Sequence, residues 1–371
     1  MKFVTLFPEG ENVHLIKSCG MVPYNMIKMG YDSTFVSYDN DEYHYIEKDV
    51  KGLKMKYLKK ILNNKLLDSL LFLSKNSKKI DVLHMYHLSK RTLLCAMLYK
   101  KINKNGVVYL KLDNTDKSYF GEKYDGNLIL KLKFFLMKFY DIISTESIDC
   151  QQYINSNFPL NLEYIPNGFY EPLEKIKINN KENIILTVSR IGTYQKNNEL
   201  MLDAFSKIYQ HIPTWKLKLV GPIDNQFNEK INSVFERNPG IKNQIEFVGE
   251  VKDRSKLNRF YDEAKIFTLS SRYEGFPTVY LEALKSGCYL VSTNFNVAKE
   301  ITKNGEYGLV VEKNNDDEYA QALLNTCNNI NFNDQLQQSI QEYAVQEYYW
   351  PSTAKKLDYL IKKALESKVR K

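Results

Sequence analysis

Short apolar runs alternate with longer amphipathic stretches along the whole chain. In the first half, the runs with the length and residue types of strands lie at residues 2–7, 34–38, 82–86, 107–112 and 142–145. In the second half, the same pattern returns at residues 184–189, 217–220, 245–248, 266–270 and 289–293. Strands that alternate with helical stretches at this spacing predict an α/β fold with doubly wound parallel sheets.

A change of composition separates these two sets of strands. An Ile-Pro-Asn-Gly turn at residues 165–168 is followed by a polar stretch at residues 171–182, and turn-forming residues gather there. The chain has 371 residues, whereas one domain usually takes about 100 to 200. We therefore predict two domains, residues 1–168 and residues 169–351, each with its own sheet.

The composition is that of a folded chain that can bury a large core. Hydrophobic residues make up 43% and charged residues 26% of the chain, with 16 glycines and 10 prolines. The five cysteines form no Cys-x-x-Cys pair, which argues against a disulfide scaffold and a zinc site. No signal-peptide pattern and no run of about 18 apolar residues occurs. We therefore expect a protein of the reducing cytoplasm without a membrane span.

The net charge of +8 is concentrated in one segment. Residues 51–80 hold nine lysines and a single acid, Asp68. Apolar residues recur there in steps of three and four, which predicts a basic amphipathic helix. Such a helix either lies on an anionic membrane or packs its apolar stripe on its own domain, and the pattern leaves both open. The lysine-rich apolar stretch at residues 128–140 slightly favours membrane contact.

Residues 265–290 form the window that carries most chemical information. They read as a strand, a tight loop at Gly275 and a helix from about Thr278. Loops at the carboxyl ends of parallel strands line the ligand crevice, and a helix N-terminus there suits a diphosphate. Glu274 and Glu282, eight residues apart, would accept hydrogen bonds from hydroxyls of a ribose and a sugar on either side of it. Ordinary loop and helix acids also occur at this spacing.

The sequence around this pair resembles a known element. Residues 271–277 read Ser-Arg-Tyr-Glu-Gly-Phe-Pro, and residues 281–287 read Leu-Glu-Ala-Leu-Lys-Ser-Gly. This resembles the E-x7-E element of the retaining glycosyltransferases of family 4, the glycosyl transferases group 1, which have the GT-B fold. The resemblance covers about residues 160–360. It implies two Rossmann-like domains facing across a cleft, the N-terminal one for the acceptor and the C-terminal one for the nucleotide-sugar donor.

A pair of cations precedes this element. Arg190 and Lys196 lie six residues apart across the loop after the first strand of the second half, where both can reach one anion. They are similar to the family's arginine and lysine, which bind the donor diphosphate and stabilise the departing nucleotide. Two cations at a leaving group that gains negative charge act by electrostatic preorganisation. The resemblance therefore implies a catalytic pair that needs no metal and no further cofactor.

The other donor contacts follow from the same resemblance. Glu282 corresponds to the residue that holds the ribose, and Glu274 to a catalytic residue at the sugar. Val251, in the Phe-Val-Gly-Glu-Val turn at residues 247–251, corresponds to a contact with the nucleotide base. The backbone contacts to the sugar fall on Gly275, Phe276, Pro277 and Thr278.

The resemblance is thin in the first domain. Relatives have a glycine-rich loop after the first strand, and this chain offers only Gly10 there. Relatives often carry a His-Asp pair near the end of a later strand, and this chain keeps Asp113, which becomes the candidate catalytic group facing the acceptor. The helix at about residues 352–371 resembles the tail that packs back on the first domain.

These features predict a retaining glycosyltransferase. It would transfer a sugar from a UDP- or GDP-sugar to a saccharide or lipid-linked saccharide, in the synthesis of a cell-surface polysaccharide, lipopolysaccharide, teichoic acid or capsule. The basic segment suggests an enzyme at the inner face of the cell membrane, peripheral to an anionic surface. A nucleotide-sugar epimerase of the same fold and a non-catalytic glycan-binding protein are the alternatives.

Other motifs carry less weight. Asp39-Asn40-Asp41 spells a metal-binding DxD, but it lies in an acid-rich loop of turn-forming residues. His84 and His87 end a strand and fit a structural role better than an acceptor contact. Nucleic-acid binding is not expected, because no recognition motif is present and lysine far outnumbers arginine in the basic segment.

Overall fold

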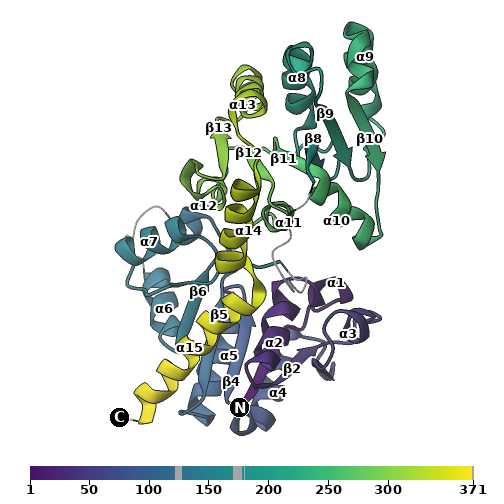
Figure 1. Cartoon of the computed structure of the whole chain (residues 1–371). Coiled ribbons are helices and arrows are strands. Elements are labelled where there is room, and N and C mark those ends of the chain that lie inside the picture. The colour runs from purple at the N-terminus through teal and green to yellow at the C-terminus, as the bar shows by residue number, and fades with distance from the viewer. Residues whose placement is uncertain (122–127, 170–177, 179, 370–371) are drawn as a thin grey trace. The chain divides into compact units, whose positions relative to one another are not determined.

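The computed structural model describes residues 1–121, 128–169, 178 and 180–369. The chain forms two compact units, one of Met1–Tyr170 together with Glu347–Lys371 and one of Glu171–Gln346 (Figure 1). Of the polar stretch predicted between the domains, residues 171–177 and 179 lie outside the described residues. The last two residues of the predicted C-terminal helix also lie outside them.

The first unit is built on a seven-stranded parallel sheet with the order β3-β2-β1-β4-β5-β6-β7. Its strands are β1 (Lys2–Leu6), β2 (Asp32–Ser37), β3 (Lys54–Tyr57), β4 (Val82–Tyr86), β5 (Val107–Lys111), β6 (Ile142–Thr145) and β7 (Glu163–Tyr164). Its helices are α1 (Asn12–Leu15), α2 (Ser18–Lys28), α3 (Tyr45–Lys48), α4 (Lys65–Asn76), α5 (Lys90–Ile102), α6 (Leu128–Met137), α7 (Ile148–Asn157) and α15 (Trp350–Val369). The strand order reverses between β1 and β4, and ligands bind at the carboxyl ends of strands at such a point.

The second unit repeats this design with six parallel strands in the order β10-β9-β8-β11-β12-β13. They are β8 (Glu182–Val188), β9 (Lys216–Val220), β10 (Ile245–Gly249), β11 (Ala264–Leu269), β12 (Tyr289–Thr293) and β13 (Gly308–Val311). The helices are α8 (Asn198–Ile208), α9 (Phe227–Arg237), α10 (Arg254–Glu263), α11 (Thr278–Lys285), α12 (Ala298–Ile301) and α13 (Asp316–Asn329), and α14 (Asp334–Tyr348) leads back to the first unit. Here the order reverses between β8 and β11.

Both sheets have helices on their two faces, and this explains the apolar runs in the sequence. Every residue of β4, β5 and β12 is buried. A strand that is buried on both faces reads as a continuous apolar run rather than as an alternation of apolar and polar residues. The predicted fold class, two doubly wound parallel α/β sheets, is therefore confirmed.

The prediction of one basic helix within residues 51–80 is wrong. Lys54–Tyr57 forms the edge strand β3, which pairs in parallel with β2, and a helix begins only at Lys65. The alternation of lysines with Met55 and Tyr57 has the period of a strand, and Met55 is the less exposed side. The helix starts where it does because the Asn64 side chain accepts hydrogen bonds from the backbone N–H groups of Leu66 and Leu67.

The C-terminal helix α15 is part of the first unit and runs beside α2 (Figure 1). Its buried residues Trp350, Leu357 and Ile361 join a core that also contains Phe3 and Met26. Asp358 accepts a hydrogen bond of 2.8 Å from the Tyr31 hydroxyl of the segment after α2. No helix within the described ranges is both long and apolar enough to cross a membrane.

Candidate functional site

A pocket of about 490 Å³ lies at the carboxyl edge of the second sheet. Segments that follow β8, β9, β10 and β11 line it, so it lies where a doubly wound sheet binds its ligands. Four of the predicted site residues line this pocket: Arg190, Lys196, Val251 and Glu274. The structure thus brings together residues from three separate loops of the sequence.

The cations and the carboxylate at this pocket are joined by polar contacts. Lys196 Nζ lies 2.5 Å from Glu274 Oε1, and both side chains are largely buried, with 12% and 7% exposed. Ser271 also donates a hydrogen bond to this carboxylate, at 2.6 Å. Arg190 donates to Gln195 Oε1 at 2.8 Å and is more exposed. Gln195, which the sequence analysis did not identify, links Arg190 to Glu274 because its side-chain amide lies 3.4 Å from that carboxylate.

Gly221, which lines the pocket at the end of β9, packs closely against the backbone after β8. Its φ of +140° and its position against β8 leave no room for a side chain, because an added Cβ would lie 1.8 Å from the Ser189 carbonyl oxygen. Only glycine adopts this backbone without strain. Its N–H bonds to Gly249 O, so the ends of β9 and β10 are fixed beside each other and Val251 follows directly.

Glu282 lies on α11 and faces α10 rather than lining the 490 Å³ pocket. One carboxylate oxygen accepts from Arg254 at 2.6 Å, and the other accepts from the Tyr261 hydroxyl at 2.8 Å. Burial raises the pKa of Tyr261 well above its usual value, and the Glu282 charge adds to this, so the phenol stays a hydrogen-bond donor. Arg254 and Tyr261 are further residues that the sequence motif did not reveal.

The loop before α11 and the first turn of this helix contribute to the wall of the pocket. The helix begins at Thr278, and Pro277 at the cap position contributes no side-chain hydrogen bond to the first turn. An added Cβ at Gly275 would meet no atom within 4 Å, so the backbone there faces open space. Val279 of the first turn lines the pocket, which places this helix start at its wall.

Gly10 of the first unit is held tightly by its neighbours. Its N–H donates to Phe7 O, and its carbonyl accepts from the side chains of Ser37, Asn40 and Tyr43. The DxD sequence at residues 39–41 thus contributes to loop structure through its central Asn40, which also donates to Pro8 O. Within the described residues, no group of three or more His, Cys, Asp and Glu side chains is placed to hold a metal ion.

Asp113 belongs to a charged cluster at the ends of β5 and β6. It has a φ of +54°, and its carboxylate accepts from Ser18 at 3.2 Å. Lys111 Nζ, fully buried, lies 2.9 Å from Glu146 Oε1. Burial raises the pKa of Glu146 to about 8, and its hydrogen bond to Asp113 contributes. Burial also acts to raise the pKa of Asp113. The hydrogen bond with Glu146 and the positive charge of Lys111 stabilise the ionised carboxylate more strongly, so the pKa of Asp113 is lowered.

The two histidines of β4 and its end have different surroundings. His84 is buried, contacts the Thr5 hydroxyl at 2.9 Å through Nδ1 and stacks on the Tyr109 ring at 4.7 Å between centroids. Burial lowers the pKa of His84 well below its usual value, so it is neutral. His87 is exposed and has a φ of +57°. The structural role predicted for a histidine here fits His84.

Comparison with known proteins identifies the second unit. The family model for glycosyl transferases group 1 matches residues 171–346. A Campylobacter jejuni alpha-1,4-N-acetyl-D-galactosaminyltransferase, named for its diphospho-undecaprenol saccharide acceptor, is 30% identical over 158 residues, which cover 42% of each chain. A Methanocaldococcus jannaschii glycosyltransferase is 24% identical over 323 residues, or 85% of each chain. The chain spans less than half the length of some curated relatives it matches, including the Campylobacter protein.

Solved structures share the fold at low sequence identity. The Anabaena protein HepE, crystallised with UDP, has a TM-score of 0.69 and 15% identity, with 98% of this chain and 99% of that chain covered. At this identity the likeness shows the fold alone, and that fold agrees with the two sheets described above. The two sheets and these neighbours show the GT-B fold, and the family match shows that the unit that holds Arg190, Lys196, Glu274 and Glu282 belongs to the glycosyl transferases group 1 family.

Proposed function

We propose that the protein is a retaining glycosyltransferase that transfers a sugar from a nucleoside diphosphate sugar to a saccharide acceptor. The observation that carries this proposal is the meeting of Arg190, Lys196 and Glu274 at one pocket, at the carboxyl edge of the second sheet. Two cations beside a carboxylate suit a ligand that is anionic at one end and rich in hydroxyls at the other. The second unit then binds the donor, and the first unit binds the acceptor.

The cation pair is proposed to stabilise the leaving group. When the bond between the anomeric carbon and the diphosphate breaks, negative charge develops on the phosphate, and fixed cations lower the energy of that state. Lys196 is held by Glu274 in this structure. A diphosphate would take over Lys196 as its partner, and Glu274 would then be available to accept hydrogen bonds from sugar hydroxyls.

Glu282 is proposed to bind the ribose while remaining in its present position. A carboxylate can accept about four hydrogen bonds, and those from Arg254 and Tyr261 use only part of this capacity. The two contacts would orient the carboxylate for the ribose hydroxyls. Val251 would contact the base, and the backbone of residues 275–278 the transferred sugar.

The acceptor hydroxyl is proposed to attack the anomeric carbon as the bond to the diphosphate breaks. Its proton would pass to the departing phosphate, which gains charge in the same step, so no enzyme nucleophile and no metal is required. Asp113 of the first unit, ionised because Glu146 and Lys111 stabilise its charge, is the proposed polar contact for the acceptor. Gly10 would shape the loop after β1.

UDP-sugars are the proposed donors, because HepE was crystallised with UDP. The proposed acceptor is a lipid-linked saccharide of a cell-surface polysaccharide pathway, and the acceptor for which the Campylobacter relative is named is likewise a lipid-linked saccharide. The test is to screen purified protein against UDP-, GDP- and ADP-sugars by thermal shift and then to follow transfer to saccharide acceptors by NMR. A product with the donor's anomeric configuration supports the proposal. Inverted product, free epimerised sugar or no nucleotide-sugar binding would contradict it.

The first unit carries a surface suited to the inner face of an anionic membrane. Four apolar side chains of α6 are exposed: Leu128 (81%), Ile129 (78%), Leu132 (58%) and Phe135 (57%). Together they are called the α6 face below. Their spacing places them along one side of the helix. The helix carries Lys131 and Lys133 and no acidic residue. Apolar side chains flanked by lysines bind the boundary between lipid headgroups and acyl chains. We therefore propose that α6, rather than the segment at residues 51–80 alone, contacts the membrane.

A further inference from the structure

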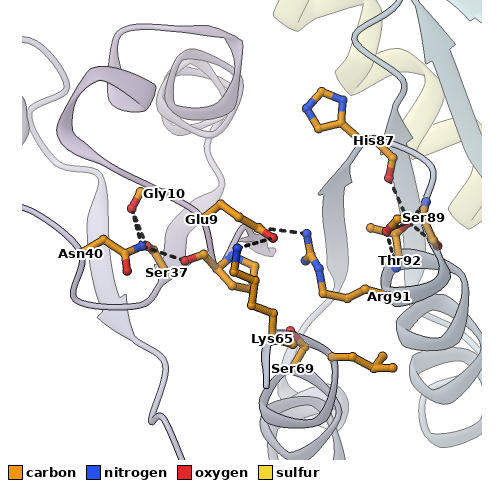
Figure 2. Close-up of polar contacts among 12 residues, drawn as sticks. Glu9, Gly10, Ser37, Asn40, Lys65, Ser69, His87, Ser89, Arg91 and Thr92 are labelled. Atoms are coloured by element: carbon orange, nitrogen blue, oxygen red, sulfur yellow. Dashed lines mark hydrogen bonds and ion pairs between the residues drawn. The ribbon is translucent and has the colours of Figure 1, made fainter. Parts of the chain in front are cut away.

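A second pocket, of about 700 Å³, lies wholly within the first unit. It is at the carboxyl ends of β1 and β4, between the first turns of α4 and α5. Glu9 comes from the loop after β1, Lys65 from α4 and Arg91 from α5 (Figure 2). Lys90, the first residue of α5, also lines the pocket. The family match does not include this part of the chain.

The pocket contains more cationic groups than its one carboxylate can pair. Glu9 Oε2 lies 3.0 Å from Arg91 Nη2, and Glu9 Oε1 lies 3.5 Å from Lys65 Nζ, so this carboxylate joins the two helices (Figure 2). Arg91 Nη1 is buried without a hydrogen-bond partner. The side-chain ammonium of Lys90 forms no hydrogen bond or ion pair with any part of the chain that the structure describes. Three cations therefore surround one acid, and two cationic groups are left unsatisfied.

The two helices add backbone donors to this excess of charge. Asn64 caps the N–H groups of Leu66 and Leu67, and Ser89 caps that of Thr92. The N–H groups of Lys65, Lys90 and Arg91 have no acceptor among the described residues. The α4 and α5 helices have 12 and 13 residues, long enough for their positive dipole ends to favour an anion.

Two of the side chains that line the pocket are aromatic and buried. Phe7 is 6% and Tyr86 1% exposed, and both line it. Arg91, which also lines the pocket, has only 14% of its side chain exposed. A charge in such surroundings is screened less than one on the surface, so an anion that reaches Arg91 gains more than it would from a solvated lysine.

We propose that this pocket binds the phosphate or diphosphate group of a phosphorylated acceptor, an inference that rests on the proposed glycosyltransferase function. A carboxylate ligand would use too few of the donors, because Glu9 already supplies one carboxylate and leaves Arg91 Nη1, Lys90 and the backbone N–H groups unpaired. A phosphate presents three oxygens and nearly two negative charges. Together with Glu9 it would balance the three cations. A free sugar phosphate and a lipid-linked saccharide both carry this chemistry, and the test below distinguishes them.

The binding test uses the full-length protein with UDP at saturation, so that the phosphate site of the second unit is filled. Glucose 6-phosphate and geranyl diphosphate are titrated by calorimetry, and methyl glucoside is the uncharged control. We expect Lys90→Gln to weaken binding of at least one phosphorylated probe by about three- to tenfold and Arg91→Gln by more than tenfold. Lys101→Gln, which removes a lysine from the opposite end of α5, should leave it unchanged.

Glu9→Gln provides a test with the opposite sign. Glu9 competes with the incoming phosphate for Arg91 and Lys65, so its neutralisation should strengthen phosphate binding severalfold. A merely structural role for Glu9 predicts no such gain. If Arg91→Gln does not fold, Lys90→Gln and Glu9→Gln still decide the question, because Lys90 is exposed and the Glu9 change is isosteric.

The outcomes separate the two sources of phosphate and separate this inference from the proposed function. Binding of glucose 6-phosphate alone supports a free sugar phosphate, and binding of geranyl diphosphate alone supports a lipid-linked diphosphate. The inference is overturned if neither phosphorylated probe binds, or if Lys90→Gln and Glu9→Gln leave the affinity for the probes unchanged. This holds even if sugar transfer is observed. Phosphate binding that depends on these residues in a protein without transfer activity would uphold an anion pocket and refute the glycosyltransferase proposal.

Discussion

The two units share one sheet design but differ in the surface they leave exposed. The first unit exposes the α6 face together with Ile61, Leu62 and Leu67 near α4. In the second unit, among the residues that the structure describes, large apolar side chains are exposed only at Ile178, Tyr194 and Tyr273. Exposed apolar patches mark sites that meet another molecule. The second unit therefore suits a small polar ligand, and the first unit suits a larger or lipid-linked partner.

The two charged pockets differ in the same way. In the second unit, Lys196 and Glu274 form a close pair, and the residues come from loops with a readable motif. In the first unit, Glu9 holds Arg91 and Lys65 from two helices, and no sequence pattern connects these positions.

The largest effect is expected from the cation pair of the second unit. Arg190→Gln or Lys196→Gln should lower kcat by about 100- to 1000-fold, because each removes a group that stabilises charge in the transition state. Steady-state transfer assays with the donor found in the screen would measure this. Lys216→Gln is the control, since this exposed lysine begins β9 at the opposite edge of the sheet. Loss below tenfold in both variants would contradict a role at the leaving group.

The buried cluster of the first unit should make stability depend on pH. Because the pKa of Glu146 is raised in the folded protein, its carboxyl group keeps a proton there at pH values above 4.5. In the unfolded chain the same group has its ordinary pKa of 4.5 and has lost that proton. This stabilisation is complete below that pH and is lost as the pH rises toward about 8. The free energy of unfolding should fall by about 2 kcal/mol between pH 6 and 8. The lowered pKa of Asp113 acts only in more acidic solution.

The variant Glu146→Gln isolates this contribution. Its amide can donate to Asp113 as the protonated acid does, but it does not titrate. Urea unfolding at pH 6 and pH 8 should therefore show a smaller difference in this variant than in the wild type, while Glu366→Gln, an exposed change on α15, should behave as wild type. Equal pH dependence in all three proteins would show that Glu146 is already ionised at neutral pH.

A smaller effect is expected at Glu282. Glu282→Gln should weaken UDP binding about tenfold, because one charge-assisted acceptor for the ribose is lost. At saturating donor, kcat should change less than affinity, since the ribose is held in the ground state as well as in the transition state. Calorimetry with UDP measures the first value and the transfer assay the second. Glu236→Gln on α9 is the exposed control, and unchanged UDP affinity in Glu282→Gln would remove the proposed ribose contact.

Sequence pattern predicted the fold where burial dictates composition. Strands such as β4 and β12 are covered on both faces, so they had to be apolar, and their limits follow from that. The edge strand β3 is half exposed and rich in lysine, so its pattern was mistaken for part of a helix. The helix period began only after the Asn64 cap.

The candidate site was predictable only where its residues are close in sequence. Arg190 and Lys196 share one loop, and Glu274 and Glu282 share one strand-loop-helix segment, so spacing carried information. Arg254 and Tyr261, which hydrogen-bond to Glu282, come from α10. Glu146, which hydrogen-bonds to Asp113, lies after β6, one strand later in the chain. The sheet brings these groups together, and no local spacing encodes such contacts.

The smallest effect is expected at the α6 face, and it tests the difference between the units. Leu132→Ser should weaken binding to vesicles that contain phosphatidylglycerol about fivefold, because one side chain loses partial burial among the lipids. Tyr194→Ser in the second unit is the matched control, since it also removes an exposed large side chain. Co-sedimentation at low and high salt measures both. Equal recovery with neutral and anionic vesicles at low salt would exclude electrostatic docking, and equal weakening by the two variants would mean that the first unit has no special affinity for a membrane.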